Sequence, residues 1–162
     1  MSELLWCVAH TKPRCEKKLA EFCEREGLTV TLPCYDSRRK YRGKSVVFRK
    51  PLFPGYVFIQ LQKRNMATLR QHDLVANLLE VFDQATLARQ LKEILIALEM
   101  GLVLQVAPDI GEGARVRIKS GPLQGVEGLV EKRQKMNVVL LRLDFINQAA
   151  AVAMEADMVE LI

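Results

Sequence analysis

The stretch Pro51-Leu52-Phe53-Pro54-Gly55-Tyr56-Val57-Phe58 constrains the fold of this 162-residue chain more than any other. Its two prolines restrict φ and remove backbone donors, and Gly55 lets the chain turn. An apolar run from Tyr56 to Leu61 follows directly and predicts a strand. The stretch therefore predicts a rigid turn that leads into a strand.

The two faces of this strand have different compositions. Side chains alternate across a strand, so Val57, Ile59 and Leu61 share one face, while Tyr56 and Phe58 share the other. We expect the aliphatic face to belong to the core. The aromatic face has two interpretations, since it either covers a second layer or docks another protein.

Length and composition limit the class of protein. A chain of 162 residues with 49% hydrophobic content can bury a core and has room for one domain or two small ones. No apolar run is long enough to span a bilayer, and the start Met1-Ser2-Glu3-Leu4 lacks the basic residues of a secretory signal. We expect two small domains in a soluble, cytoplasmic protein without membrane contact.

The cysteines and the charge add two further expectations. Cys7, Cys15, Cys23 and Cys34 form no C-x-x-C pair or zinc-type cluster, so free thiols are favoured over disulfides and no metal is expected. Residues 1–90 hold 16 Lys and Arg against 9 Asp and Glu, whereas the remainder holds 8 against 10. This asymmetry favours a polyanion as the partner of the N-terminal half and a protein as the partner of the C-terminal half.

The chain opens with a predicted strand and helix. Leu4 to Ala9 is short and apolar, which predicts a strand. In the helix that follows, we expect Thr11 to be the cap, Pro13 to lie in the first turn and Gly27 to end the element.

The rest of the N-terminal half alternates strands with one short helix. The predicted segments are 28–35 and 45–48 for a hairpin, 53–61 for a strand, 65–72 for a helix and 78–82 for a returning strand. This half is therefore expected to be α/β.

The C-terminal half is different in kind. Ala85 to Met100 has apolar residues at helical spacing, and the Gly/Pro-containing residues 106–113 interrupt regular structure. We place an N-terminal domain at 1–100, a linker at 101–110 and a C-terminal domain at 111–162. Short β-rich runs at 116–118, 125–130 and 138–143 predict a small β-barrel. Strands are also expected within 148–161, despite the helix propensity of its alanines, and the whole chain is classed as α+β.

Basic residues gather in two clusters that can attract phosphates or an acidic protein face. No acid follows Asp36 in the hairpin tip, although an exposed turn can also carry such charges merely to remain solvated. Nucleic-acid contact is the favoured interpretation, with DNA and RNA both open. The candidate residues are Lys12, Arg14, Lys17 and Lys18 at the start of the first helix, and Arg38, Arg39, Lys40 and Arg42 in the hairpin tip.

Catalytic patterns are not found. His10 and His72 have no nearby nucleophile arrangement, and the glycine-rich residues 121–128 lack the Lys-Ser/Thr of a phosphate-binding loop. Gly121, Gly125 and Gly128 are expected to serve turns between strands. We therefore expect no enzymatic activity and no cofactor.

Three features in order resemble the NusG family of transcription elongation factors. They are Trp6-Cys7-Val8-Ala9-His10-Thr11 leading into a basic helix, the Pro51 to Phe58 stretch, and Val116 to Gly128, which looks like a KOW motif with Gly121, Gly125 and Gly128 in its turn. The resemblance covers nearly the whole chain.

The resemblance implies an N-terminal domain that docks on the clamp helices of the largest catalytic subunit of RNA polymerase, so that the enzyme pauses less. Lys12, Arg14 and Lys17 would face the non-template DNA strand. Ala67 replaces a histidine of a His-Thr-Thr contact known in the family, which weakens the case for a second contact there. The implied polymerase-binding residues are His10, Phe53, Pro54, Tyr56, Phe58 and Thr68.

The C-terminal barrel of the family recruits either the termination factor Rho or a small-subunit ribosomal protein. The short linker resembles the specialised RfaH-like paralogs, which prevent termination on particular operons, more than the housekeeping members. We expect a monomeric antitermination factor whose C-terminal domain does not refold into helices, because Pro122 and four glycines between Gly113 and Gly128 disfavour them. The alternatives are a housekeeping factor coupled to Rho, or a KOW-type RNA-binding module acting on ribosomal RNA.

Overall fold

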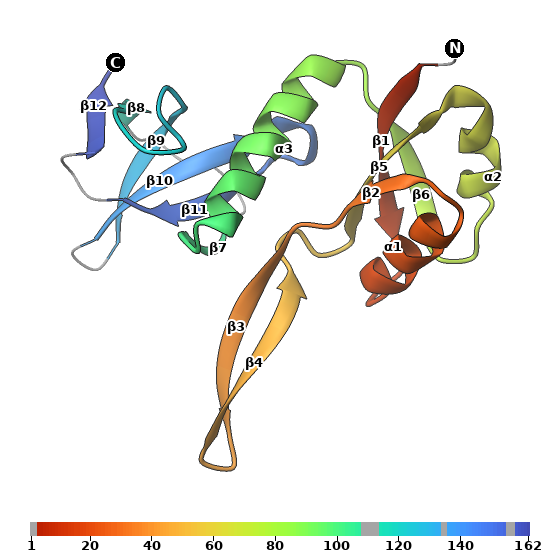
Figure 1. The fold of residues 1–162 in the computed structure, drawn as a ribbon, viewed down its shortest axis with the longest axis horizontal. Coiled ribbons are helices and arrows are strands. Elements are labelled where there is room, and N and C mark those ends of the chain that lie inside the picture. The colour runs from red at the N-terminus through yellow and green to blue at the C-terminus, as the bar shows by residue number, and fades with distance from the viewer. Residues whose placement is uncertain (1–2, 108–113, 134–135, 155–157) are drawn as a thin grey trace. The chain divides into compact units, whose positions relative to one another are not determined.

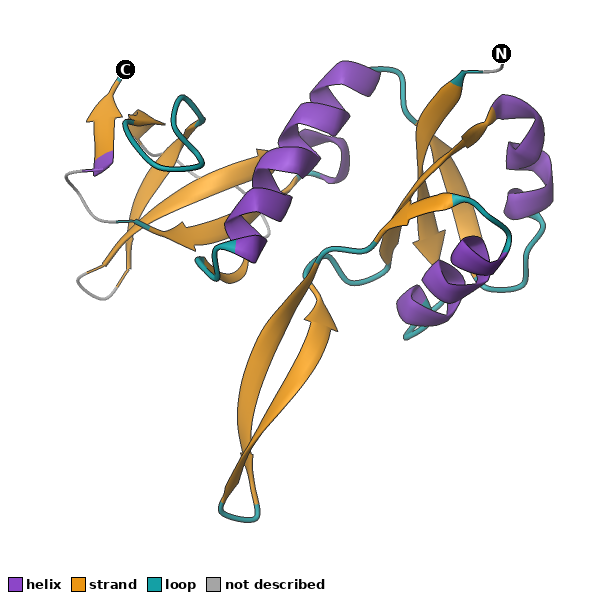
Figure 2. Cartoon of the chain, in the orientation of Figure 1, coloured by secondary structure: helices purple, strands orange, loops and turns teal. Residues whose placement is uncertain are grey.

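The computed structural model describes residues 3–107, 114–133, 136–154 and 158–162. It divides into two compact units, Met1–Ala85 and Thr86–Ile162. Within the described ranges, no helix combines the length and the apolar character needed to cross a membrane. The mixed α+β class predicted from the sequence is confirmed (Figure 2).

The first unit is built on a four-stranded antiparallel sheet in the order β2-β5-β1-β6 (Figure 1). Its strands are β1 (Leu4–Thr11), β2 (Thr29–Thr31), β5 (Tyr56–Gln62) and β6 (Val75–Glu80). The central pair β1 and β5 is in continuous register from Leu4 opposite Gln62 to His10 opposite Tyr56. The strand predicted after the Pro51–Phe58 stretch is thus a central one.

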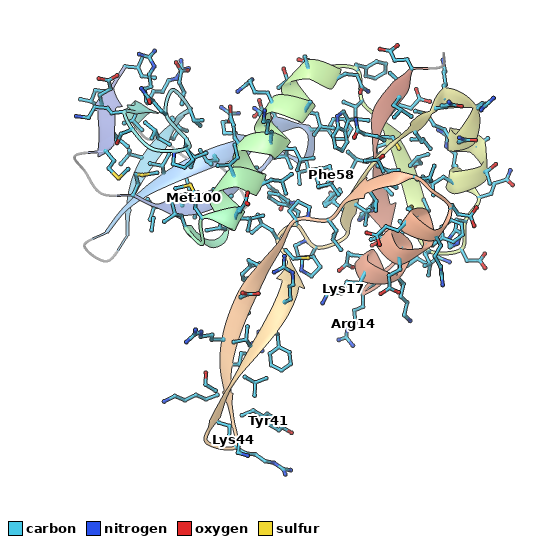
Figure 3. All side chains as sticks on the ribbon, in the orientation of Figure 1. Arg14, Lys17, Tyr41, Lys44, Phe58 and Met100 are labelled. Carbon is cyan, nitrogen blue, oxygen red and sulfur yellow. The ribbon has the colours of Figure 1, made fainter. Side chains whose placement is uncertain are left out.

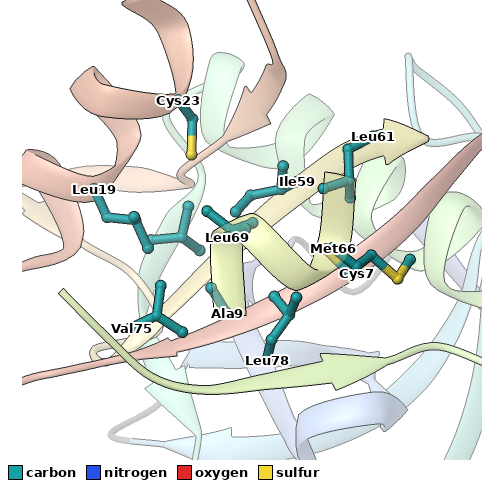
Figure 4. Packing of buried hydrophobic residues seen from close by; sticks show 11 residues of the cluster. Cys7, Ala9, Leu19, Cys23, Ile59, Leu61, Met66, Leu69, Val75 and Leu78 are labelled. Atoms are coloured by element: carbon teal, nitrogen blue, oxygen red, sulfur yellow. The ribbon is translucent and has the colours of Figure 1, made fainter. Parts of the chain in front are cut away.

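Helices α1 (Glu16–Arg25) and α2 (Met66–Arg70) cover one face of this sheet, and the 3-10 turn η1 (Lys63–Asn65) precedes α2 (Figure 1). Buried side chains from both helices meet the aliphatic face of β1 and β5 (Figure 4). Val57, Ile59 and Leu61 all belong to this core, which confirms the face assignment made from the alternating pattern.

The start of α1 differs from the prediction. β1 continues through Thr11 and α1 begins only at Glu16, so Thr11 lies before the helix, and its Oγ1 caps none of the backbone N–H groups of α1. Cys15 takes the N-cap position without a side-chain hydrogen bond. The predicted end is confirmed, since Gly27 has a φ of 77°, which ends the helix in the left-handed region.

A hairpin is present as predicted, but its strands are β3 (Cys34–Tyr41) and β4 (Lys44–Pro51), which form a separate two-stranded sheet. In the segment 28–35 predicted as its first strand, Thr29–Thr31 instead form β2 and pair with β5. Arg42 and Gly43 connect them with φ values of 51° and 78°. Two positive φ angles in a two-residue loop are typical of the type I′ turn, whose twist matches that of paired strands. The hairpin is longer than the sequence pattern predicts.

The second unit is a six-stranded antiparallel sheet in the order β12-β8-β9-β10-β11-β7, together with most of helix α3 (Gln84–Glu99). The 3-10 turn η2 (Asp144–Ile146) follows β10. The strands are β7 (Val103–Ala107), β8 (Ala114–Ile118), β9 (Glu127–Arg133), β10 (Met136–Leu143), β11 (Gln148–Ala153) and β12 (Val159–Leu161). Strand formation in 148–161 is confirmed at β11 and β12, and the β-rich unit is consistent with the expected KOW domain.

The linker predicted at 101–110 is wrong in its described part. Val103–Ala107 form β7 and pair with β11, and the division between the compact units falls after Ala85, so α3 lies largely with the C-terminal strands. The Gln90 amide fastens the helix there: its Nε2 donates to Asp144 Oδ2, and its Oε1 accepts from the Asp144 N–H, each at 2.9 Å. The predicted end of the linker and start of the last domain lie outside the described residues.

Candidate macromolecule-binding surfaces

The loop before β5 brings His10 and Tyr56 together. These residues are register partners on β1 and β5, and their rings stack with centroids 5.2 Å apart and an interplanar angle of 28°. The loop is held by the Tyr56 N–H, which donates to the Phe53 carbonyl at 3.2 Å, and by the Thr11 N–H, which donates to the Gly55 carbonyl at 2.8 Å. The stack is thus anchored to two central strands.

Gly55 is favoured at this position by its φ of 87°, which other residues rarely adopt. A Cβ added there would lie 3.5 Å from the imidazole of His10, which is an ordinary van der Waals contact, so the backbone conformation alone selects glycine. His10 and Pro54 are exposed and Tyr56 is half-buried. We call His10, Pro54 and Tyr56 the docking patch.

Phe53 and Phe58 do not contribute exposed surface to this patch. Their side chains are 1% and 0% exposed, and they pack edge to face with centroids 6.4 Å apart. The resemblance implies that both residues contact a partner, whereas the structure buries them. The face of β5 that carries Tyr56 and Phe58 therefore combines the two interpretations. Phe58 is buried, as expected if it covers a second layer, whereas Tyr56 remains partly open to solvent.

Thr68 lies apart from the docking patch. It is exposed on α2, beside exposed Ala67. Met66 and Leu69 of α2 pack on the aliphatic face of the sheet, opposite to the face that carries Tyr56. The sheet therefore separates Thr68 from the other predicted polymerase-binding residues.

The basic cluster at the start of α1 contacts the base of the hairpin. Lys12, Arg14, Lys17 and Lys18 are all exposed at the start of α1. Lys17 Nζ donates to the Arg49 carbonyl of β4 at 2.5 Å (Figure 3). This bond places the start of α1 against the base of the hairpin, whereas Arg38, Arg39, Lys40 and Arg42 lie further along the hairpin toward its tip.

The basic residues of the hairpin form few ion pairs within the hairpin. Arg49 pairs with Asp36 at 3.5 Å, near the base. Within the described residues, Arg38, Arg39, Lys40 and Arg42 are exposed and form no ion pair with a carboxylate. Their charges are therefore available to an external anion.

The Cys34 thiol lies near Arg49 and Lys17 at the base of the hairpin, and its pKa is affected by both. Burial raises the pKa of its thiol above the usual value, and the cations of Arg49 and Lys17 partly oppose that effect by favouring the thiolate. Burial remains the larger effect, so the pKa of the Cys34 thiol stays above its usual value despite these two cations.

The sequence reasoning did not select two exposed aromatic residues within the hairpin. Tyr41 is 64% exposed and Phe48 is 47% exposed. The guanidinium carbon of Arg42 lies 5.7 Å from the Tyr41 ring centroid. The signal that could have found them is the Arg-Gly turn, because a two-residue loop determines which residues pair across the hairpin.

In the second unit, the glycines of the KOW-like segment have two distinct roles. Gly121 and Gly125 adopt φ values of 86° and 88° in the turn between β8 and β9, as predicted for turn residues. Gly128 instead lies inside β9, opposite Val116. A Cβ on Gly128 would lie 2.7 Å from Val139 Cγ1 and 2.8 Å from the Leu140 carbonyl oxygen, so close strand packing is what requires glycine.

These observations define a small α+β protein of two units. Its described residues include a stack of exposed His10 on half-buried Tyr56, and exposed basic residues on α1 and on the hairpin. Such an arrangement is typical of proteins that bind other macromolecules.

The chain belongs to the NusG family: the family model described as "Transcription termination factor nusG" matches residues 4–95. The protein is thus a transcription factor of that family. Among solved structures, one match is the crystal structure of the MjSpt4:Spt5 complex in conformation B, with 16% identity, 98% of this chain and 97% of that chain covered, and a TM-score of 0.34. No curated protein matches the sequence.

Proposed function

We propose that this protein is a transcription elongation factor that binds RNA polymerase through the docking patch, suppresses pausing and promotes antitermination on particular operons. The polymerase contact is the clamp helices of the largest catalytic subunit. The observation that supports it is the exposed stack of His10 on Tyr56, held by a hydrogen-bonded turn at the ends of two central strands. A preorganised aromatic surface loses little conformational entropy on binding.

The basic residues at the start of α1 would provide a second contact, with DNA, beside the polymerase contact of the docking patch. Exposed Lys12, Arg14 and Lys17 would face the non-template DNA of the transcribing complex. The C-terminal unit would recruit Rho or a small-subunit ribosomal protein. We propose a cytoplasmic monomer that acts without a cofactor.

The test is a pull-down of purified elongation complexes with the full chain and with Tyr56→Asp. Aspartate removes the ring that stacks on His10 and adds a charge to the patch, so we expect binding to be lost. Phe82→Asp is the matched control, because Phe82 is 94% exposed and lies outside the docking patch. Equal binding of the wild-type chain and Tyr56→Asp would contradict the docking proposal.

Readthrough on a template with a Rho-dependent terminator separates the two kinds of factor. Increased readthrough supports specialised antitermination, whereas unchanged or increased termination indicates a housekeeping factor.

The exposed basic residues of the hairpin favour one alternative, an RNA-binding module that acts on ribosomal RNA without polymerase. In that case neutralising Arg38, Arg39, Lys40 and Arg42 would abolish ribosomal RNA binding, no elongation complex would be captured, and Tyr56→Asp would have no effect.

A further inference from the structure

The hairpin register separates its side chains into two faces. Pairing is continuous from Cys34 opposite Pro51 to Tyr41 opposite Lys44, and directly opposed residues project on the same side. One side, which we call the aromatic face, carries from tip to base the pairs Tyr41–Lys44, Arg39–Val46, Ser37–Phe48 and Tyr35–Lys50. The reverse face carries Lys40–Ser45, Arg38–Val47, Asp36–Arg49 and Cys34–Pro51.

The rings of Tyr41 and Phe48 are exposed and belong to no buried core, although the Arg42 guanidinium lies over one side of the Tyr41 ring. The hairpin is a sheet of its own, and Tyr41 and Phe48 remain largely open to solvent. A covered aromatic side chain buries about 150–250 Å² of surface, so leaving these rings exposed forgoes a large stabilisation. Their exposure is instead what a surface needs to bind a partner.

The aromatic face alternates rings with cations. Successive side chains on one face of a strand are about 7 Å apart, so the four pairs span roughly 20 Å. Tyr41 lies beside Lys44 at the tip (Figure 3), Arg39 follows, and Phe48 comes next. The only carboxylate of the hairpin, Asp36, is on the reverse face and pairs with Arg49.

Rings interleaved with cations match the chemistry of a nucleic-acid strand whose bases are unpaired. Base faces stack on aromatic side chains while Lys and Arg neutralise the phosphates. In a duplex the base faces are already stacked on one another, so the rings would contribute little. An acidic peptide without apolar side chains would use the cations but would leave Tyr41 and Phe48 without a matching partner.

We propose that the aromatic face of the hairpin binds single-stranded nucleic acid, with bases stacked on Tyr41 and Phe48 and phosphates held by Arg39 and Lys44. The proposal extends the nucleic-acid contact of the proposed function and requires no polymerase. DNA and RNA share the base faces and phosphates that this face would recognise.

The test is fluorescence anisotropy of the full chain with labelled oligo(dT), oligo(U) and a duplex of equal length. We expect oligo(dT) or oligo(U) to bind more tightly than the duplex, and the tighter of the two to identify the source. Tyr41→Ala and Phe48→Ala should each weaken binding by at least about five-fold, as expected for one stacked base. Val47→Ala, which changes an exposed residue of the reverse face, should leave the affinity unchanged.

Two double variants distinguish a contribution of the aromatic face to binding from a contribution of total charge. Arg39→Gln with Lys44→Gln and Arg38→Gln with Lys40→Gln remove equal charge from opposite faces. We expect the double variant of the aromatic face, Arg39→Gln with Lys44→Gln, to weaken binding more than the double variant of the reverse face. Circular dichroism of each variant checks that the fold is retained.

Equal losses in the two double variants, with no effect of Tyr41→Ala or Phe48→Ala, would overturn the proposal. Preference for the duplex, or competition by polyglutamate as strong as that by oligo(dT), would also overturn it. Tyr56→Asp should bind oligo(dT) normally, so this proposal and the polymerase-docking proposal can fail separately.

Discussion

Gly128 shows how one residue controls the packing of the C-terminal sheet. It lies in β9 where β10 approaches so closely that an added Cβ would collide with the Val139 side chain and the Leu140 backbone. The collision with Val139 could be relieved by a side-chain change, whereas the collision with a carbonyl oxygen requires the strands to move apart.

We therefore predict that Gly128→Ala lowers the free energy of unfolding by about 1–3 kcal/mol. Adding Val139→Ala should not restore stability, because the contact with the Leu140 carbonyl remains. Urea denaturation of the three proteins provides the measurement. A Gly128→Ala protein as stable as the wild type would contradict the observed packing.

Cys7 makes the free energy of unfolding depend on pH in the alkaline range. Burial, followed by the neighbouring Cys23, raises the pKa of the Cys7 thiol from 9.0 to about 12. Above pH 9 the unfolded chain releases this proton while the folded chain keeps it. The free energy of unfolding contributed by the neutral thiol is therefore fully present below pH 9 and declines as the pH rises toward about 12.

We predict that, above pH 9, ionisation of this thiol in the unfolded chain makes the free energy of unfolding fall by roughly 1 kcal/mol more per pH unit. Urea titrations from about pH 8 to about pH 11 should show a shallower decline for Cys7→Ala than for the wild type. Cys15→Ala is the control, because Cys15 is only half-buried. Parallel slopes for Cys7→Ala and the wild type would refute the prediction.

At the scale of elements, α3 depends on two amide side chains at different points along its length. Gln84 Oε1 accepts from the Trp6 N–H at 2.7 Å, and Gln84 Nε2 donates to the Trp6 carbonyl at 2.9 Å. Gln90 makes its paired hydrogen bonds with Asp144 of η2. The side chain of Gln90 is buried, whereas Asp144 is exposed and its Oδ1 also pairs with Arg142 Nε at 2.9 Å. The cost of losing the Gln90 side chain is therefore that of two hydrogen bonds, one of them to a charged group.

We predict that Gln90→Ala destabilises the C-terminal unit by about 1–3 kcal/mol. The matched control is Lys92→Ala, which truncates an exposed side chain of the same helix and should change the stability by less than about 0.5 kcal/mol. Hydrogen exchange at β10 and β11 would report the difference. Equal protection in the two variants would show that the Gln90 contact does not stabilise the unit.

At the scale of the whole molecule, the chain combines two β-rich units with opposite charge tendencies. The C-terminal unit forms strands even at Gln148–Ala153, where the sequence is rich in alanine. Its register places Ala149 and Ala151 against β10, and both are buried in a small core with Val138 and Leu140. Strand pairing and burial in this core therefore override the helix propensity of the alanines.

We predict that the C-terminal unit stays β-stranded in the free chain and in the polymerase-bound chain. Gly121 and Gly125 have positive φ, each glycine disfavours a helix by about 1 kcal/mol, and Pro122 adds about 3 kcal/mol. NMR chemical shifts of residues 138–154 should be those of strands in both states. Helical shifts in either state would contradict the prediction.

The sequence by itself determined the types of most elements and the core face of β5, because alternation, glycines and prolines act over a few residues. It also located the basic clusters and the aromatic stretch that carry the proposed function. The same local reasoning misplaced the cap of α1 at Thr11 and a turn at Gly128. It also made residues 103–107 a linker, because it cannot detect pairing between distant strands.

Only the tertiary structure decided which candidate residues share a surface. It stacked His10 on Tyr56 through the register of β1 and β5, buried Phe53 and Phe58, and tied Lys17 to the base of the hairpin. It also placed α3 largely with the C-terminal strands. These outcomes depend on contacts between residues far apart in the chain, whose geometry is set by the packed sheets and not by local periodicity.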